Sequence, residues 1–308
     1  MASDQTGSMR IENLTINMAG RSVVKYLILS LLTLLILAVA SVGYTVWRSF
    51  KLPEDHPEIF APIAEQKILA CLGDSITHGH VGQGYIKQVR AELAKHDVAV
   101  MNAGINGDLA YNLYQRLDAV IAHRPDFVSV MIGTNDANGS LNEAKEQMYM
   151  EMKDLPQAPE LDFYREFLTK IVKRLKSETN AKVALLSLPV LGEDLNSKAN
   201  RAIQKHNTVI NEIALNEQVT YLPLNEAQVA VLETEAIPEA LRLSDSAARN
   251  SLAKAQFSHY ILQRSWDEVA AGNNLVLTTE TIHMSDRGAA MIAEQILGFV
   301  TPHAISMP

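Results

Sequence analysis

Four short polar segments hold the residues whose types and spacing can do chemistry. They are Gly73–Thr77 (GDSIT), Asn102–Asp108 (NAGINGD), Gly133–Asp136 (GTND) and Glu280–His283 (ETIH). A serine hydroxyl can attack a carbonyl carbon, and a histidine held by a carboxylate can accept the hydroxyl proton. Backbone and side-chain N–H groups can stabilise the oxyanion that forms. These are the parts that acyl transfer by a nucleophilic serine requires.

Each segment supplies one or more of those parts. Ser75 is the candidate nucleophile, and its backbone N–H lies where a helix is expected to begin. Gly107 offers an N–H that no side chain screens, and Asn135 offers a side-chain amide. His283 is the candidate base, and Glu280 stands three residues before it to fix the imidazole tautomer. Taken singly, each has an ordinary explanation as a helix cap, a turn or a buried structural histidine.

Two other histidines compete for the role of base. His78 and His80 follow Ser75 within five residues. Side chains so close to the expected start of a helix can point in several directions, so we rank both below His283. The presence of all four segments in one chain favours a hydrolytic site far more than any one segment does.

The elements between the segments predict an α/β fold. Five short apolar runs read as strands buried on both faces: Ile68–Leu72, Val98–Met101, Phe127–Ile132, Val183–Leu188 and Val219–Leu222. Amphipathic helices are expected near Tyr85–Lys95, Leu109–His123, Leu161–Glu178 and Lys198–Asn216, with a last helix over Asp286–Val300. This alternation predicts a parallel sheet with helices on both faces. The first three segments directly follow strands, so they should gather at the carboxyl edge of the sheet.

Two connections are longer than ordinary loops. Asn138–Glu160 follows the third strand, and Asn225–Leu277 follows the fifth. Within the second, apolar residues recur at helical spacing from Ala248 to Val269, after a possible cap at Ser244-Asp245. We therefore expect a helical insertion at about residues 225–277.

The first long connection carries Met148, Tyr149, Met150 and Met152 in a short, methionine-rich helical stretch. Methionine side chains are flexible and can line a pocket for apolar acyl chains. The ordinary alternative is that a short helix buries these residues against the body of the protein, as amphipathic helices usually do.

The N-terminal part predicts a membrane anchor. Tyr26–Trp47 is 22 residues without a charge, with aromatic residues at both ends. At about 1.5 Å per residue such a helix can cross a bilayer. A cleaved signal peptide is the alternative, because Ala38-Val39-Ala40 has the small-x-small form of a cleavage site. The apolar run continues past that site, which favours an uncleaved anchor.

The residues around this segment indicate an orientation. Arg10, Arg21 and Lys25 precede it, whereas Arg48 and Lys51 follow it. The excess of positive charge before the segment favours a cytoplasmic N-terminus, with the catalytic domain on the non-cytoplasmic side. We expect an N-terminal flank at 1–25, the anchor at 26–47 and an exposed tether at 48–66 that contains three prolines between Leu52 and Pro62.

Composition narrows the classes of protein. The 308-residue chain is 47% hydrophobic and 20% charged, which is typical of a globular protein and excludes a disordered one. Its net charge is −8, and the part after residue 48 carries −10, which argues against nucleic acid as a partner. The single cysteine excludes an intramolecular disulfide.

The four segments together resemble the sequence blocks of the SGNH/GDSL hydrolase superfamily. GDSIT matches the block of the nucleophile, NAGINGD that of the oxyanion glycine, GTND that of the asparagine and ETIH that of the histidine. The likeness covers about residues 67–302. It implies a three-layer, doubly wound sheet of five parallel strands in flavodoxin-like order. It also implies Ser75, His283 and Glu280 as the catalytic residues, and Ser75, Gly107 and Asn135 as the oxyanion hole.

One position departs from the family pattern. The family usually places aspartate three residues before the histidine, and here that residue is Glu280. Glutamate can orient an imidazole as aspartate does, with one more methylene to accommodate. Asp286 is the rival carboxylate, but its place at the start of the last helix gives it a capping role.

We therefore interpret the chain as a membrane-tethered esterase that cleaves carboxylic esters through an acyl-enzyme. No metal and no organic cofactor is expected. A low aromatic content of 6% offers no obvious platform for stacking sugars, which favours small-molecule or lipid esters. A carbohydrate O-deacetylase of the same fold is the alternative. A membrane-anchored module that only binds its ligand is a third possibility, which the intact Ser75, Asn135 and His283 argue against.

Overall fold

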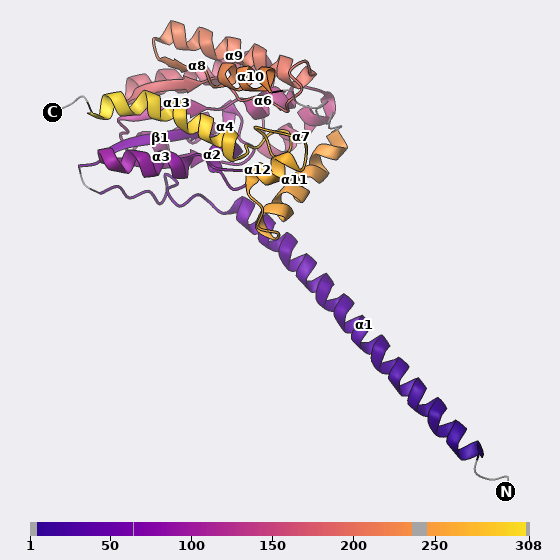
Figure 1. Cartoon of the computed structure of the whole chain (residues 1–308). Coiled ribbons are helices and arrows are strands. Elements are labelled where there is room, and N and C mark those ends of the chain that lie inside the picture. Colours follow the sequence, from indigo (N-terminus) through magenta and orange to yellow (C-terminus); the bar gives the residue numbers. More distant parts are fainter. Residues whose placement is uncertain (1–4, 64, 236–244, 306–308) are drawn as a thin grey trace. The chain divides into compact units, whose positions relative to one another are not determined.

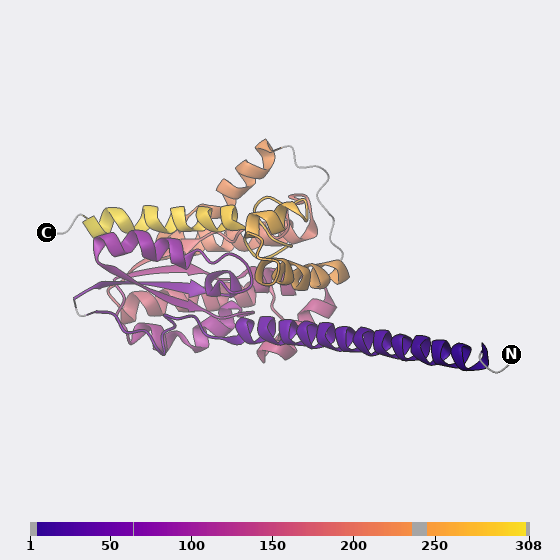
Figure 2. The same cartoon turned by 60° about the horizontal axis from the view of Figure 1, so that its bottom comes forward.

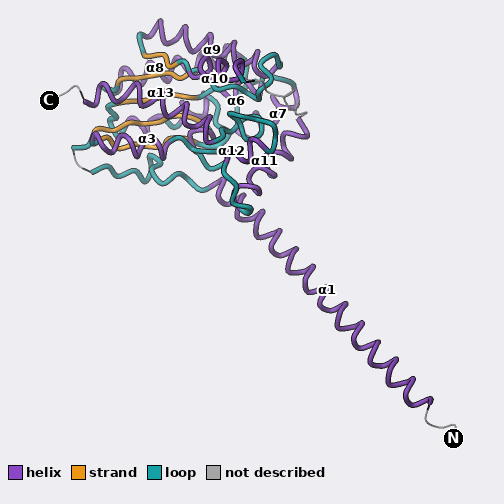
Figure 3. Tube along the Cα trace, in the orientation of Figure 1, coloured by secondary structure: helices purple, strands orange, loops and turns teal. Residues whose placement is uncertain are grey.

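The computed structural model describes residues 5–63, 65–235 and 245–305 of the chain. It divides into two compact units, Met1–Arg48 and Ser49–Pro308. The first unit consists of helix α1 (Gln5–Phe50), whose range runs two residues into the second unit. Figure 1 colours the elements along the sequence, and Figure 3 shows α1 as one continuous helix.

Helix α1 contains an apolar stretch long enough to cross a membrane. Val23–Tyr44 comprises 22 residues with a mean hydropathy of 2.5, and none of its most apolar stretch is buried. At about 1.5 Å per residue it is roughly 33 Å long. It is the one such stretch among the described residues, and it begins and ends three residues before the predicted anchor. A signal sequence near the N-terminus can also meet these requirements of length and hydropathy.

The second unit is built on one sheet of five parallel strands. The strands are β1 (Lys67–Gly73), β2 (Val98–Gly104), β3 (Phe127–Met131), β4 (Lys182–Leu186) and β5 (Thr220–Leu222). Their order is β2-β1-β3-β4-β5, which confirms the flavodoxin-like prediction. In the register, Gly73 pairs with Gly104 and Met131, so the strand ends that precede three of the four segments are neighbours.

Alternate side chains of the strands face two different helical layers, which is why these strands read as apolar runs. Leu69 and Cys71 of β1 pack toward α3 (Ile86–Leu93) and α13 (Asp286–Ile305). Ala70 and Leu72 pack toward the opposite layer. That layer consists of α4 (Ala110–Gln115), α5 (Leu117–Ile121), α8 (Leu161–Glu178) and α9 (Lys198–Glu217). Figures 1 and 2 both show α13, in yellow, beside α3. The predicted three-layer α/β architecture is confirmed.

Two predicted helices are each divided in two. The helix predicted over Leu109–His123 breaks at Arg116, where the chain leaves helical geometry between α4 and α5. The helical pattern over Ala248–Val269 is divided into α11 (Asp245–Tyr260) and α12 (Trp266–Ala271). Between them Gln263 takes a left-handed conformation, and the Ser265 side chain caps α12. The cap predicted at Ser244 lies outside the described residues.

The remaining helices are short. Helix α2 (Ser75–His78) begins at Ser75, where a helix was expected to begin, and α7 (Glu143–Lys153) contains the predicted helical stretch with the methionines. The helix predicted over Tyr85–Lys95 ends in the 3₁₀ turn η1 (Ala94–His96), whereas α6 (Thr134–Gly139) and α10 (Leu224–Thr234) were not predicted. Two of them, α2 and α6, begin directly at strand ends, and α7 lies in the first long connection. The long connections thus consist largely of helix rather than loop.

The prediction of an exposed tether at 48–66 is wrong for its central part. Pro53 and Pro57 are buried, and the Asn102 N–H donates a 2.9 Å hydrogen bond to the Asp55 carbonyl. Asn102 belongs to β2, an edge strand whose outer N–H groups lack a strand partner. His123 also contacts the Pro57 carbonyl at 2.7 Å. The segment therefore covers the open edge of the sheet, a common way of protecting edge strands.

Candidate active site

The first segment places Ser75 at a sharp turn between β1 and α2. Gly73 ends the strand in space too tight for a side chain, since a Cβ there would lie 2.7 Å from the Met131 carbonyl oxygen. Asp74 caps α2, its carboxylate accepting a 2.9 Å hydrogen bond from the Ile76 N–H. Ser75 is the first residue of α2, so its N–H is one of the donors that the first helical turn leaves without a backbone partner.

The last segment brings His283 to the serine hydroxyl. His283 Nε2 lies 2.9 Å from Ser75 Oγ, and Nδ1 contacts Oε1 of Glu280. Both side chains of the His–Glu pair are buried. An imidazole held in this way by a carboxylate on one nitrogen can accept a proton on the other.

The Glu280 carboxylate is surrounded by donors. Its oxygens accept from the N–H groups of Thr281, Ile282 and His283, from the Thr281 hydroxyl, and from the His283 ring. Burial alone would raise the pKa of this carboxyl group, but His283 and these donors outweigh it and lower the pKa to about 2. Glu280 is therefore ionised, and its contact with Nδ1 holds the His283 ring in place.

Hydrogen bonds join the other two segments to the first. The Ile105 N–H donates to the Gly73 carbonyl at 3.3 Å, and the Asn135 amide nitrogen donates to the Asp108 carbonyl at 2.9 Å. Gly107 has φ of +75°, a conformation that glycine adopts without strain. Among the described residues no acceptor takes up the Gly107 N–H. This donor and the second amide hydrogen of Asn135 remain available to a ligand.

The rival residues are engaged elsewhere. His78 Nε2 lies 3.1 Å from the Lys51 carbonyl, and burial lowers the pKa of His78 to about 3. The His80 ring stacks edge-on against His78 at 4.4 Å. Asp286 accepts a 3.1 Å hydrogen bond from the Asp267 N–H, so it caps the first turn of α12 rather than its own helix. Of the three histidines, His283 is the one that contacts the Ser75 hydroxyl, and Glu280 is the carboxylate that contacts its ring.

Sequence reasoning missed a set of charged side chains behind the oxyanion segment. Asp108 forms ion pairs with Arg116 Nε at 2.7 Å and with Lys153 Nζ at 2.8 Å. Arg116 also donates to the Gly73 carbonyl at 3.1 Å. Lys153 stands 45 residues beyond Asp108, on α7, so no local spacing could reveal the pair. These contacts fix the turn that carries Gly107.

Two further buried carboxyl groups lie beside the site. Burial raises the pKa of Asp74 to about 6 and that of Asp136 to about 7. Asp136 accepts a 3.2 Å hydrogen bond from the Ala110 N–H, which holds the start of α4 against the segment that carries Asn135. Among the described residues, no group of three or more His, Cys, Asp or Glu side chains is arranged to hold a metal ion.

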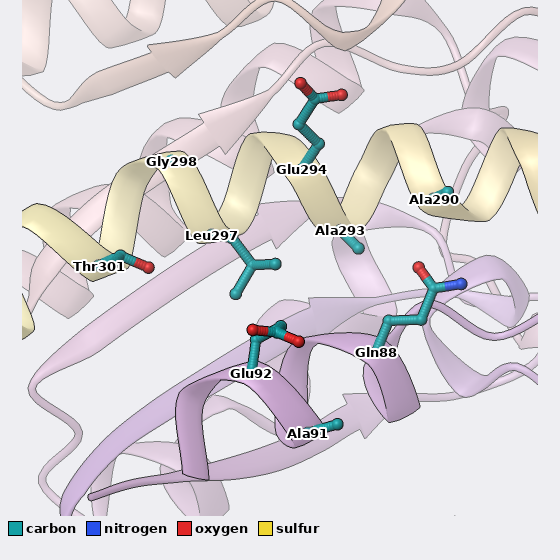
Figure 4. Close-up of a pocket in the computed structure, with 9 residues that line it drawn as sticks. All are labelled: Gln88, Ala91, Glu92, Ala290, Ala293, Glu294, Leu297, Gly298 and Thr301. Carbon is teal, nitrogen blue, oxygen red and sulfur yellow. The ribbon is translucent and has the colours of Figure 1, made fainter. Parts of the chain in front are cut away.

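A surface hollow of about 740 Å³ lies away from this constellation, between α3 and α13. Figure 4 shows that its lining combines small residues such as Ala91, Ala293 and Gly298 with the longer side chains of Gln88, Glu92, Glu294 and Leu297. None of the residues of the four segments lines it, so it is not a continuation of the candidate active site.

Comparison with known proteins identifies the family. A sequence model of the GDSL-like lipase/acylhydrolase family matches residues 71–291, which is most of the chain. The chain belongs to this family. The resemblance to SGNH/GDSL hydrolases is thereby confirmed, and the protein is a hydrolase of carboxylic esters.

Individual relatives share the fold and part of the sequence. An acetylxylan esterase from Geobacillus stearothermophilus is 27% identical over 187 residues, which cover 54% of this chain and 80% of that protein. A variant structure of the enzyme from that organism superposes with a TM-score of 0.55 at 21% identity, covering 80% of this chain and 98% of the other. A lipase/acylhydrolase from Enterococcus faecalis superposes with a TM-score of 0.51 at 19% identity, covering 77% of this chain and 97% of the other.

Catalytic variants of the Geobacillus stearothermophilus esterase replace a serine, an aspartate and a histidine, with the aspartate three residues before the histidine. In this GDSL hydrolase the residue three before His283 is Glu280. Through Oε1 the Glu280 side chain contacts Nδ1 of the His283 ring, while its second oxygen accepts from Thr281 and Ile282.

Proposed function

We propose that the protein is a serine esterase in which Ser75 is the nucleophile, His283 the base and Glu280 the acid. The observation that carries this proposal is the 2.9 Å contact between His283 Nε2 and Ser75 Oγ, with ionised Glu280 behind the ring. Ser75 Oγ attacks the ester carbonyl carbon while its proton passes to Nε2. The imidazolium is stabilised by Glu280 and then gives the proton to the leaving alcohol.

The acyl-enzyme is hydrolysed by the reverse sequence. Water attacks the Ser75 ester with His283 as base, and the carboxylic acid leaves. In both steps the negative oxygen is bound by the N–H groups of Ser75 and Gly107 and by the Asn135 amide. Among the described residues no acceptor is recorded for the N–H groups of Ser75 and Gly107, and the Asn135 amide uses one of its two hydrogens for the Asp108 carbonyl.

Ser75→Ala tests this mechanism. Ester turnover should fall by about 10³-fold or more, because removal of a nucleophile abolishes the acyl-enzyme route. The matched control is Ser140→Ala, which removes an exposed hydroxyl that donates to the Ala137 carbonyl at the end of α6. If folded Ser75→Ala keeps near-normal ester turnover, equal to that of Ser140→Ala, the mechanism is wrong.

For the substrate we propose short acyl esters of a carbohydrate. The acetylxylan esterases among the relatives support this class. The structure adds that α7 crowds the oxyanion turn, since a Cβ built on Gly107 would lie 2.8 Å from Lys153 Cε and 3.2 Å from Met152 Cε. A long acyl chain would have to displace these side chains, whereas an acetyl group would not.

The second candidate substrate is a longer-chain or lipid ester. It is favoured by Met148 and Met152 on α7, which are 42% and 54% exposed and could line an acyl channel. Turnover of acetyl, butyryl and octanoyl esters of one alcohol, beside acetylated xylo-oligosaccharide, separates the two. Acetyl preference that relaxes in Met152→Ala supports crowding by α7. Octanoyl preference that is lost in the same variant supports a lipid ester.

We also infer that α1 anchors the enzyme in a membrane with the catalytic unit on the non-cytoplasmic side. The apolar length of Val23–Tyr44 and the basic residues that precede it support this placement. Only six residues separate Tyr44 from Lys51, whose carbonyl bonds His78 of the catalytic unit. N-terminal sequencing of the mature protein and protease protection in sealed vesicles test it. A mature N-terminus after Ala40 would establish a signal peptide instead.

A further inference from the structure

A chain of hydrogen bonds connects helix α7 to Asn135. Lys145 Nζ donates to Asn138 Oδ1 at 2.8 Å, and Asn138 Nδ2 donates to Tyr149 Oη at 3.1 Å. The Tyr149 hydroxyl donates to Asn135 Oδ1 at 2.7 Å, and Asn135 Nδ2 donates to the Asp108 carbonyl at 2.9 Å. Tyr149, Asn138 and Asn135 are buried, and Lys145 is half-buried.

Chemistry at the two ends fixes the direction of every bond. An ammonium group has only donors, so the Asn138 atom that faces Lys145 must be the oxygen, and Asn138 presents its NH₂ to Tyr149. The Tyr149 oxygen accepts there, which directs its own proton to Asn135 Oδ1. At the other end the Asp108 carbonyl only accepts, so Asn135 must present its NH₂ to it. Both ends require the same orientation of the Asn135 amide.

This orientation is the one that the oxyanion hole needs. The Asn135 amide nitrogen carries two hydrogens, and the bond to Asp108 uses one of them. Because Tyr149 holds the oxygen and Asp108 holds one hydrogen, the plane of the amide is fixed and the second hydrogen has one direction. A flipped amide would set its oxygen against the Asp108 carbonyl oxygen, which is repulsive.

Resting on the proposed function, we propose that Tyr149 and Lys145 are positioning residues that orient and polarise the Asn135 amide as an oxyanion donor. Each group in the chain becomes a more acidic donor because it also accepts a hydrogen bond, from Lys145 at Asn138, from Asn138 at Tyr149 and from Tyr149 at Asn135. The effect of the Lys145 charge is thereby passed toward the Asn135 NH₂. The buried setting strengthens such coupling, because the local dielectric constant is low. Helix α7 thus contributes to the chemistry although it touches none of the reacting atoms.

The alternative is that Tyr149 only packs. Its ring belongs to a small apolar cluster with Leu109 and Leu155. Tyr149→Phe keeps the ring and removes the hydroxyl, so it separates packing from positioning. We expect kcat to fall by about 10- to 100-fold, part of the 10²- to 10³-fold effect of losing an oxyanion donor. KM should stay within about twofold, because the Asn135 N–H acts mainly on the transition state.

The Lys145 variants test the polarisation step separately. Lys145→Met should lower kcat less than Tyr149→Phe does, by about three- to tenfold, while Lys145→Arg, which keeps the charge and the donors, should restore most of it. Tyr221→Phe is the matched control, since it removes a 2.6 Å tyrosine bond to Glu226 at the outer strand β5. Its kcat should equal that of the unmodified protein.

The decisive comparison uses Asn135→Ala in the full-length protein, assayed with one acetyl ester. Tyr149→Phe added to Asn135→Ala should lower kcat no further, because Tyr149 acts through Asn135. The proposal would be overturned if the kcat loss of the double variant equalled the product of the two single losses. It would also be overturned by an unchanged kcat in folded Tyr149→Phe. Ser75→Ala is run beside them. If it keeps its turnover, the proposed mechanism itself has failed, whereas loss in Ser75→Ala with no loss in Tyr149→Phe rejects the positioning role alone.

Discussion

Replacing Glu280 by glutamine should damage both turnover and stability, and the structure sets the size of each effect. The carboxylate accepts from five donors, two of them on His283. Glutamine keeps one accepting oxygen and turns an NH₂ group toward the remaining donors. Losing one or two hydrogen bonds to a charged group costs about 2–5 kcal/mol of unfolding free energy.

The pKa of Glu280 gives a second estimate of how much its carboxylate contributes to the free energy of unfolding. It is lowered from 4.5 to about 2, which corresponds to roughly 3 kcal/mol of stabilisation at neutral pH. Because the folded-state pKa is depressed, this stabilisation is present above pH 4.5 and is lost as the pH falls toward about 2. Glu280→Gln has no such group and should lack this part of the acid sensitivity.

The larger effect of Glu280→Gln should be on kcat rather than on the free energy of unfolding. Without the carboxylate the His283 ring loses the partner that fixes its tautomer and stabilises its protonated form, and amidation of the acid in other serine triads lowers kcat by about 10⁴-fold. The assay is kcat for an acetyl ester at pH 7, beside urea unfolding at pH 7 and pH 3. The control is Asp286→Asn, which removes a carboxylate bonded to the Asp267 N–H and should keep its turnover. A folded Glu280→Gln enzyme with kcat within threefold of the original, or loss confined to Asp286→Asn, would refute this reasoning.

Three further predictions concern pH, the oxyanion turn and the N-terminal helix. Burial raises the pKa of Asp136 to about 7, so its stabilising effect exists below its ordinary value of 3.8 and is lost as the pH rises through 7. Between pH 5 and pH 8 the melting temperature of Asp136→Asn should therefore fall less than that of the original protein. An equal fall in both proteins would contradict this. Gly107→Ala, at φ of +75° and with its Cβ 2.8 Å from Lys153 Cε, should lower kcat about tenfold at similar KM; an unchanged kcat would remove the Gly107 N–H from the oxyanion hole. Removal of residues 1–48 should leave a soluble enzyme with unchanged kcat, because the second unit is compact by itself, whereas aggregation on gel filtration would contradict it.

The fold was largely predictable because two periodicities dominate the sequence. Runs such as Ile68–Leu72 are apolar on both faces, and α8 repeats its apolar residues at helical spacing, so both elements were placed correctly. The apolar pattern did not predict the break at Arg116, whose side chain bonds Asp108 eight residues earlier and the Gly73 carbonyl at the end of β1. Pattern reasoning cannot see such long-range polar contacts.

In the candidate site, too, the residues within the sequence motifs were predictable, whereas the residues that act through long-range contacts were not. The residues that the motifs name, Ser75, Glu280 and His283, are joined by hydrogen bonds in the structure. Tyr149 and Lys145 were visible in the sequence only as part of a methionine-rich connection, because their relation to Asn135 depends on how α7 folds back over α6. The covering role of residues 53–57 was missed for a similar reason, since its proline content is equally typical of a free linker.

The most direct test of the central claim is the location of a covalent adduct. The full-length protein is treated with a fluorophosphonate, which reacts with activated serines, and the modified peptide is identified by mass spectrometry. We predict a single adduct on Ser75 that appears at the same rate as esterase activity disappears, and that forms far more slowly in His283→Ala. An adduct on another residue, or full ester hydrolysis by a protein that the probe does not modify, would contradict catalysis by Ser75.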